Sequence, residues 1–285
     1  MDNTLLWIIL ITFIAGVGGT GLGGSVSIFI KKDSTKTVSL LLGFAGGVML
    51  AVVCFDLLID ALTSNGADSS QRLPIVILGT AVGYALIALL NNIIDKKTNP
   101  EIEHIDEFHP KTADNLDELI HADHLEKHCG DRTNNLFAAG MIMASAIALH
   151  NFPEGMVIGA AYTRSSDLTL WTGSGFVLAV LIGLHNIPEG MAITVPLVAC
   201  GMKKWRAVLI TAASGLPTVI GAILGYWLGT ISDITQVLAL SFASGAMLYV
   251  VFGELLPESI LMWRSKLPAV AVMIGIAVGM VIIFA

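Results

Sequence analysis

Eight apolar stretches, each long enough to cross a membrane as a helix, constrain the fold of this chain more than any other feature. A spanning helix needs roughly 20 mostly apolar residues. Charged residues make up only 13% of the 285 residues, whereas soluble domains carry about 25%. We therefore predict an all-α membrane protein with a single transmembrane domain over residues 1–285. The expected spans cover residues 4–31, 37–63, 73–94, 135–162, 169–199, 205–230, 235–263 and 267–285.

Lysine and arginine alternate between the predicted loops. The loops after the first, third, fifth and seventh spans are basic, whereas the other loops contain only Arg72 and Arg164. Basic loops face the cytoplasm, so both termini are expected on the outer side of the cell (inner) membrane. The basic loops hold thirteen of the fifteen Lys and Arg residues, namely Lys31, Lys32, Lys36, Lys96, Lys97, Lys111, Lys127, Arg132, Lys203, Lys204, Arg206, Arg264 and Lys266.

An internal repeat joins the second and seventh spans. FAGGVMLAVVCFDLLID at residues 44–60 and FASGAMLYVVFGELLPE at residues 242–258 are identical at nine of 17 positions. The two spans run in opposite directions, so the copies are related by an axis in the membrane plane, as in many secondary transporters. Spans 1–3 are thus expected to mirror spans 6–8 around spans 4 and 5. The aligned acids are Asp56 with Glu254 and Asp60 with Glu258.

The fourth and fifth spans carry one motif each, HNFPEGM at residues 150–156 and HNIPEGM at residues 185–191. Charged or polar side chains at bilayer depth are costly, so they are functional hypotheses by default. Histidine and glutamate at i and i+4 share one face of a helix. The proline between them kinks the helix and frees a backbone carbonyl, and the following glycine allows close approach.

The depth of the two motifs predicts that they meet. The helices are antiparallel, and each histidine lies roughly 20 to 24 Å from the outer end of its helix at 1.5 Å per residue. His150 is then expected near Glu189, and Glu154 near His185. Two imidazoles and two carboxylates suit a borderline cation such as zinc. With Asn151 and Asn186 beside them the site could hold two ions; polar contacts that only join helices are the plainer alternative.

These features make the chain similar to the ZIP (Zrt/Irt-like) family of metal transporters, in particular its bacterial members. The resemblance rests on eight spans, a long cytoplasmic loop after the third, and the paired HNxPEG motif. It implies a primary transport site with an adjacent second site, a methionine in the second span and an acid on the inner exit path. The implied residues are His150, Glu154, His185 and Glu189 (primary), Asn151 and Asn186 (second), Met49, and Glu254.

The chain departs from the family pattern at two positions. Some relatives carry a glutamate in the sixth span where this chain has Thr218, and many carry a histidine where it has Gly253. A second ion would therefore be held more weakly or not at all. Met49 has an alternative interpretation as core filler, with Met247 at the symmetric place. Asp56 is predicted to lie on the outer path, while Asp60 and Glu258 are also compatible with solvated helix ends.

The loop over residues 95–133 contains 11 acids and five of the seven histidines. Weak metal binding and a disordered acidic linker both remain open for it. The three cysteines, Cys54, Cys129 and Cys200, form no CxxC pair. No basic patch for nucleic acid and no prosthetic group are expected. The expected partners are divalent metal ions and the bilayer, and a homodimer is one assembly that stays open.

The leading functional hypothesis is a carrier that moves zinc, or alternatively Fe, Mn, Co or Cd, towards the cytoplasm. A passive metal channel remains the alternative, because the same ligand-lined path serves either. An intramembrane metalloprotease fits poorly, since its usual motif is HExxH and here each glutamate stands four residues after a single histidine. We therefore expect a transporter and not an enzyme.

Overall fold

The computed structural model describes residues 3–29, 35–63, 69–98, 132–163, 171, 173–263 and 265–284. This part of the chain is helical and contains no strand. Eight helical segments in it are long and apolar enough to span a membrane, from Thr4–Ser27 to Leu267–Phe284, with mean hydropathies of 1.2 to 2.7. The prediction of an all-α protein with eight spans is therefore confirmed.

Four of the eight spans are interrupted and four are single helices. The interrupted spans consist of α1 (Asn3–Phe13), η1 (Ile14–Gly18) and α2 (Gly19–Ser27); α3 (Thr35–Val52), η2 (Val53–Leu57) and α4 (Leu58–Thr63); α9 (Lys204–Ser214) and α10 (Leu216–Ile231); and α11 (Asp233–Tyr249), η4 (Val250–Leu255) and α12 (Leu256–Met262). The single helices are α5 (Ser69–Thr98), α7 (Arg132–Tyr162), α8 (Ser174–Ala199) and α13 (Leu267–Phe284).

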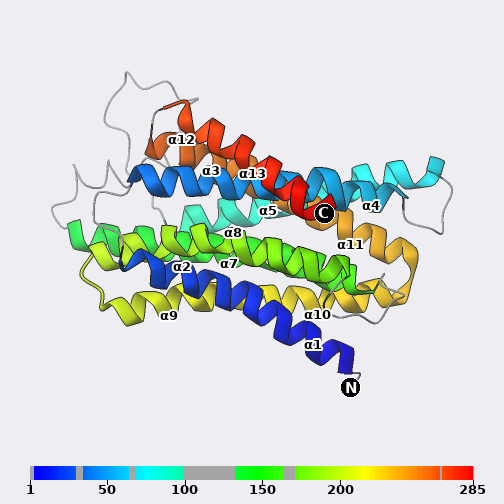
Figure 1. Ribbon diagram of the computed structural model, residues 1–285, viewed down its shortest axis with the longest axis horizontal. Helices are drawn as coiled ribbons and strands as arrows, with labels where there is room; N and C mark the ends of the chain where they lie inside the picture. Colours follow the sequence, from blue (N-terminus) through cyan, green and yellow to red (C-terminus); the bar gives the residue numbers. More distant parts are fainter. Residues whose placement is uncertain are drawn as a thin grey trace.

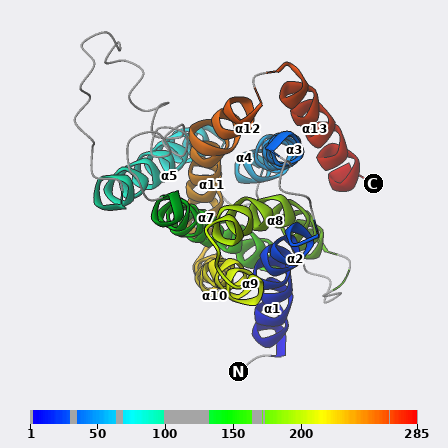
Figure 2. The same ribbon diagram turned by 90° about the vertical axis from the view of Figure 1, so that its left-hand side faces the viewer.

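The helices run along the long axis of the molecule, and both chain termini lie towards the same end (Figure 1). In the end-on view α7 and α8 occupy the middle of the bundle (Figure 2). α10 packs on α7 and α2 packs on α8, while α3 pairs with α13 and α11 pairs with α5. Exchanging spans 1 with 6, 2 with 7, 3 with 8 and 4 with 5 converts the contact of α10 with α7 into that of α2 with α8. The same exchange converts the contact of α3 with α13 into that of α11 with α5. This is the pairing that an inverted repeat requires.

Glycine contacts place the repeat in register. A Cβ at Gly47 in α3 would collide with the carbonyl oxygen of Val272 in α13. The aligned Gly245 in α11 would collide in the same way with the carbonyl oxygen of Thr80 in α5. Glycine lets the two backbones touch at these points, so the same helix crossing occurs twice, once in each half.

The interruptions also occur at equivalent places. The π-helical turns η2 and η4, in which the hydrogen bonds run from i to i+5, overlap when residues 44–60 are aligned with 242–258. The sixth span breaks at Gly215, which is followed by Pro217 in the first turn of α10. When the alignment of residues 44–60 with 242–258 is extended to the first and sixth spans, this break falls on η1 of the first span. Gly16 of η1 and Gly215 contact each other there.

Burial divides the spans into central and peripheral ones. α8 and the second and seventh spans are about two-thirds buried, whereas α5 and α13 are mostly exposed. The exposed faces are apolar, with Ile77, Trp227 and Val281 each more than half exposed. This arrangement suits lipid as the surrounding solvent, so the chain is a multi-pass membrane protein.

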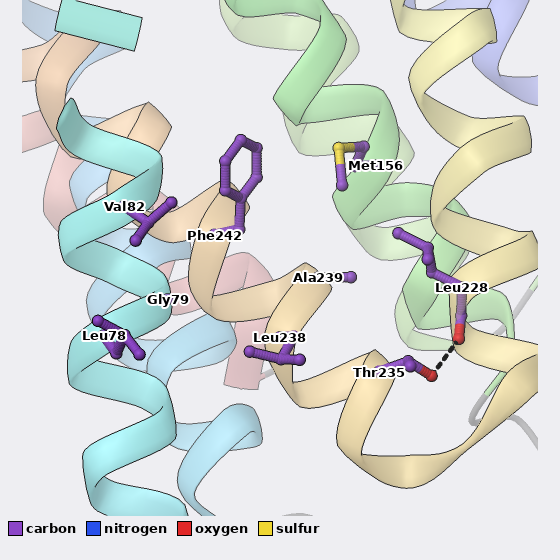
Figure 3. A pocket seen from close by; sticks show the side chains of 9 residues that line it. All are labelled: Leu78, Gly79, Val82, Met156, Leu228, Thr235, Leu238, Ala239 and Phe242. Atoms are coloured by element: carbon purple, nitrogen blue, oxygen red, sulfur yellow. Dashed lines mark hydrogen bonds between the residues drawn. The ribbon is translucent and has the colours of Figure 1, made fainter. Parts of the chain in front are cut away.

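A cavity of about 330 Å³ opens between α5, α7, α10 and α11 (Figure 3). Its single hydroxyl group, on Thr235, already donates a hydrogen bond of 2.7 Å to the carbonyl oxygen of Leu228. No charged side chain or histidine lines it, so it offers no ligand for a cation. The lining residues are Leu78, Gly79, Val82, Met156, Leu228, Thr235, Leu238, Ala239 and Phe242.

Candidate metal centre

The paired motifs bring four ionisable side chains into the protein interior. α7 and α8 pack against each other in the middle of the bundle (Figure 2). The side chains of Glu154, His185 and Glu189 have no exposed surface, and His150 is 2% exposed. Both helices continue through their prolines, Pro153 and Pro188.

The side chains pair across the two helices, as their depth predicts. Nε2 of His185 lies 3.0 Å from Oε1 of Glu154. Nε2 of His150 lies 3.6 Å from Oε2 of Glu189. Each histidine thus faces the glutamate of the other motif, and the antiparallel arrangement explains why two separate i, i+4 pairs form one cluster.

Three of these residues, Glu154, His185 and Glu189, offer one ligand atom each within 4.8 Å of one another. Zinc binds imidazole nitrogen and carboxylate oxygen at about 2.0–2.2 Å, so the ligands of a tetrahedral ion stand about 3.4 Å apart. The cluster therefore needs only a small contraction to enclose an ion. His150 lies at its edge and can act as a fourth ligand through Nε2.

Most polar atoms of the cluster have no hydrogen-bond partner. This holds for both nitrogens of His150, both carboxylate oxygens of Glu189, Oε2 of Glu154 and Nδ1 of His185. Leaving buried polar atoms unpaired costs about 1–3 kcal/mol each, and more for charged groups. A cation would satisfy several of these atoms at once, which makes the cluster a site suited to a metal ion.

Asn151 and Asn186 are held by the backbone of the interrupted spans. Nδ2 of Asn151 donates to the carbonyl oxygen of Ser214, 2.9 Å away, at the end of α9. Nδ2 of Asn186 donates to the carbonyl oxygen of Ala15, 3.3 Å away, in η1. Both amide oxygens remain buried without a partner. Each asparagine is thus anchored through its donor group and keeps its acceptor free for a cation.

Thr218 is one of the two positions at which the sequence departs from the ZIP pattern. Its side chain is fully buried in α10 and its hydroxyl oxygen has no partner. A Cβ at Gly16 would lie 2.6 Å from that oxygen, so Thr218 borders the junction of η1 with α9 and α10. A hydroxyl is neutral and is a weaker metal ligand than a carboxylate. Thr218 therefore supplies no charged ligand in α10 beside this junction.

Glu254 reaches the cluster from the opposite side. Its Oε2 lies 3.4 Å from Nδ1 of His150, and its side chain is 14% exposed. It belongs to η4 of the seventh span. The sequence predicts that it lies on the inner path, and the structure brings it into contact with His150.

The remaining predicted residues lie further along the spans. Met49 is fully buried in α3 within the hydrophobic core, and Met247 is equally buried in α11. Asp56 lies in η2 and is partly exposed. The metal roles of Met49 and Asp56 stay predictions. Glu258 requires a correction, because it is only 8% exposed and is not a solvated helix end.

A comparison with protein families decides what kind of protein carries this cluster. The family described as ZIP Zinc transporter matches residues 4–284. The chain belongs to the ZIP family. Members of this family transport divalent metal ions and are not enzymes, so this chain is a transporter.

Individual ZIP-family relatives cover nearly the whole chain. The zinc transporter ZupT of Clostridium perfringens (strain 13 / Type A) is 33% identical over 264 residues, which span 90% of this chain and 88% of that protein. The zinc transporter ZupT of Akkermansia muciniphila is 33% identical over 260 residues, with 89% and 87% covered. The zinc transporter ZupT of Chlorobium chlorochromatii (strain CaD3) is 30% identical over 263 residues, with 91% and 90% covered.

Sequence reasoning missed two parts of this ZIP-family site. The backbone carbonyls of Ser214 and Ala15 anchor the asparagines, and only the Gly-Leu-Pro run at residues 215–217 signalled an interruption nearby. The burial of Glu258 had no sequence signal. The histidine-bearing loop, residues 95–133, lies almost entirely outside the described residues, so its expected weak metal binding stays a prediction.

Proposed function

We propose that this ZIP-family protein moves divalent transition-metal ions, zinc first among them, across the cell (inner) membrane through the His/Glu cluster of α7 and α8. The observation that carries the proposal is the convergence of the paired motifs. Four buried side chains from two antiparallel helices meet with most of their polar atoms unpaired. Such an arrangement is costly unless a cation completes it.

The ligand set suits zinc but does not restrict the cargo to it. Imidazole and carboxylate ligands together match a borderline cation such as Zn²⁺, and they also bind iron(II), manganese, cobalt and cadmium. The relatives named above are described as zinc transporters. We therefore propose zinc as the main cargo, and no prosthetic group takes part in its transport.

A second ion position is proposed beside the first. Asn151 and Asn186 each present a buried, unpaired amide oxygen, and Glu154 keeps one free carboxylate oxygen that could bridge two ions. Thr218 contributes only a hydroxyl group. The second ion is consequently held more weakly than the first, because its other protein ligands are neutral oxygens.

The direction of transport is proposed to be towards the cytoplasm. The positive-inside rule places the loops after the odd-numbered spans in the cytoplasm, which puts Glu254 on the inner half of the path and Asp56 on the outer half. Both termini then lie outside. Met49 is proposed to line the central site from α3. All ligands proposed for this path belong to one chain, so the path does not depend on whether the protein forms a homodimer.

Burial of the centre favours a carrier over a passive channel. The central side chains are 0–2% exposed, so an ion bound there is closed off from both sides. The first exposed ligand on the way out is Glu254 at 14%. An ion can leave a closed centre only after the protein rearranges, and carriers of this kind saturate at low substrate concentration.

Zinc-65 uptake into proteoliposomes tests the proposal. We compare the native protein with His150→Ala/His185→Ala and with a loop variant in which the histidines of residues 95–133 are replaced. The double variant should lose uptake while the loop variant keeps it. Normal uptake by the double variant would refute the central site, and uptake that stays linear with zinc concentration would favour a channel.

A further inference from the structure

Gln236 carries a buried amide group near the start of α11, outside the metal centre. Its side chain is 6% exposed. Its Nε2 atom donates hydrogen bonds to the carbonyl oxygen of Ala160, 3.2 Å away, and to Oγ1 of Thr163, 3.1 Å away. Oγ1 of Thr163 in turn donates to the carbonyl oxygen of Ala160 over 2.7 Å. These bonds tie the start of α11 to the end of α7, the helix that carries His150 and Glu154.

The end of α10 packs around the same hydrogen bonds. A Cβ at Gly229 in α10 would collide with the side-chain oxygen of Thr163, so α10 lies directly against this hydroxyl. The hydroxyl of Thr235, the residue before Gln236, donates to the carbonyl oxygen of Leu228 in α10 (Figure 3). α7, α10 and α11 therefore form a junction at the end of the bundle towards which both chain termini lie (Figure 1).

The inverted repeat contains the same helix crossing twice. α11 packs on α7, and α3 packs on α8. α11 begins at Asp233 and α3 begins at Thr35, and these two residues are equivalent when residues 44–60 are aligned with 242–258. The two crossings therefore have the same register, and their equivalent positions face opposite ends of the bundle.

Only one of the two crossings carries hydrogen-bonding side chains at these positions. In the repeat Gln236 corresponds to Val38, and the alignment of the HNxPEG motifs pairs Thr163 with Val198. Val38 is 3% exposed and belongs to the hydrophobic core. The side chain of valine has neither a donor nor an acceptor, so apolar packing holds this second crossing at the position where hydrogen bonds hold the first.

This difference affects transport because transporters with inverted repeats open their two ends in turn around one site. The end with Val38 can open without breaking a side-chain hydrogen bond at this position. Opening of the other end separates the amide of Gln236 from both of its acceptors, and a buried donor left unpaired is costly. The hydrogen bonds thus favour the state in which that end is closed, as it is in this structure.

We propose that Gln236 is a latch that keeps this end of the transporter closed by holding the end of α7 against α11. The positive-inside orientation makes this the outer end, so the latch limits how often the central cluster is open to zinc from outside. The inference rests on the proposed function of that cluster and on the proposed orientation. Gln236 is a positioning residue, because its partner Thr163 stands nine residues after Glu154, about 14 Å further along the helix.

Zinc-65 uptake into whole cells that lack their own zinc uptake systems measures entry from the outer side alone and tests the latch. Gln236→Met removes the amide and keeps the length of the side chain. Thr163→Val removes one acceptor at nearly constant volume, and Thr163→Ser keeps the hydroxyl. Thr12→Val is the matched control, because the buried hydroxyl of Thr12 bonds carbonyl oxygens of its own helix. Hydrogen exchange of the purified full-length protein measures opening of the junction directly.

Gln236→Met should lower the apparent KM for zinc, because a larger share of the molecules is then open to the outside and able to bind. We expect a decrease of about threefold or more, since two hydrogen bonds of ordinary strength bias an equilibrium at least this far. Thr163→Val should lower the KM less, and Thr163→Ser and Thr12→Val should leave it unchanged. The amides at the end of α7 and the start of α11 should exchange faster in Gln236→Met than in the native protein.

A latch and a merely structural role give different results. Damage to the fold lowers the maximum rate of uptake and does not lower the apparent KM. An unchanged or higher KM in Gln236→Met therefore overturns the latch, and so does native hydrogen exchange at the junction. If His150→Ala/His185→Ala retains normal uptake, the proposed central site is wrong; hydrogen exchange then still tests the latch, because it does not depend on where zinc binds.

Discussion

Gly155 of the first motif lies directly against the main chain of Thr218, so that a Cβ at Gly155 would collide with the Thr218 carbonyl oxygen. Gly190 of the second motif has the same relation to Thr20, which aligns with Thr218 in the repeat. The final glycine of each HNxPEG motif thus seats its helix on the first or sixth span. Glycine is required because only hydrogen fits between these backbones.

Replacement of Gly155 should therefore disturb both stability and transport. In Gly155→Ala, α7 and α10 must separate, and overpacking of this kind costs about 1–3 kcal/mol. The adjacent Glu154 moves with the backbone and should bind zinc more weakly. A loss of about 1.4 kcal/mol in the free energy of zinc binding lowers the affinity tenfold, so we expect zinc uptake to fall by about tenfold or more. Thermal unfolding and zinc-65 uptake measure the two effects. Gly18→Ala is the control, since its Cβ would meet nothing closer than 3.8 Å.

Glu189→Gln should separate the stability of the metal-free protein from metal binding. Both carboxylate oxygens of Glu189 are buried without a hydrogen bond, and the nearest cationic group among the described residues is Nε2 of His150, 3.6 Å from Oε2. Burying a neutral amide costs less than burying a charge. The melting temperature of the metal-free variant should be equal to or higher than that of the native protein. Zinc should raise the melting temperature of the variant less than that of the native protein, or not at all, because this increase depends on the affinity for zinc. A full zinc-induced increase in the variant would contradict a ligand role.

Thr218→Asp should strengthen the second ion position. The change places a carboxylate of nearly the same volume where this chain has an unpaired, buried hydroxyl. We expect the affinity for one weakly bound zinc ion to rise by about tenfold or more, which corresponds to a gain of about 1.4 kcal/mol or more in binding free energy. Isothermal titration calorimetry measures the change. Thr218→Val, which removes only the hydroxyl, should alter the weak site little; unchanged binding in Thr218→Asp would place the second ion elsewhere.

Met49→Leu distinguishes a ligand from core filler. The volumes are similar, and such exchanges usually cost less than about 1.5 kcal/mol. If the thioether of Met49 contacts the cargo, uptake of the softer cadmium ion should fall more than uptake of zinc. Met247→Leu is the matched control, because Met247 is equally buried at the symmetric position in α11. Equal cadmium uptake in both variants would assign Met49 to the core.

Much of the centre follows from sequence because it depends on helical spacing. The i, i+4 separation and the depth of the motifs suffice to place His150 opposite Glu189 and Glu154 opposite His185, with no knowledge of the other spans. The register of the repeat likewise follows from residues 44–60 and 242–258, and the glycine contacts confirm the resulting crossings.

The parts that sequence did not predict depend on contacts between distant segments. Glu258 lies near the end of its span, where either burial or solvation is compatible with the pattern. It is buried where α12 packs on α3, and there Ser39 and Ser259 each donate a hydrogen bond to the carbonyl oxygen of the other. The contact of Glu254 with His150 depends on the direction in which the π-helical turn η4 presents the Glu254 side chain. The asparagine anchors depend on main-chain carbonyls, whose availability no side-chain pattern records.

The π-helical turns at the same position of the second and seventh spans bear on the origin of the chain. Each turn adds one residue to a helix, and a single such insertion is normally unfavourable and rare. Two independent insertions at matching places, in segments of opposite membrane orientation, would be a coincidence. It is simpler that the insertion arose once, in an ancestral three-span segment, and was copied when that segment was duplicated. The irregular turn would then be older than the full-length transporter.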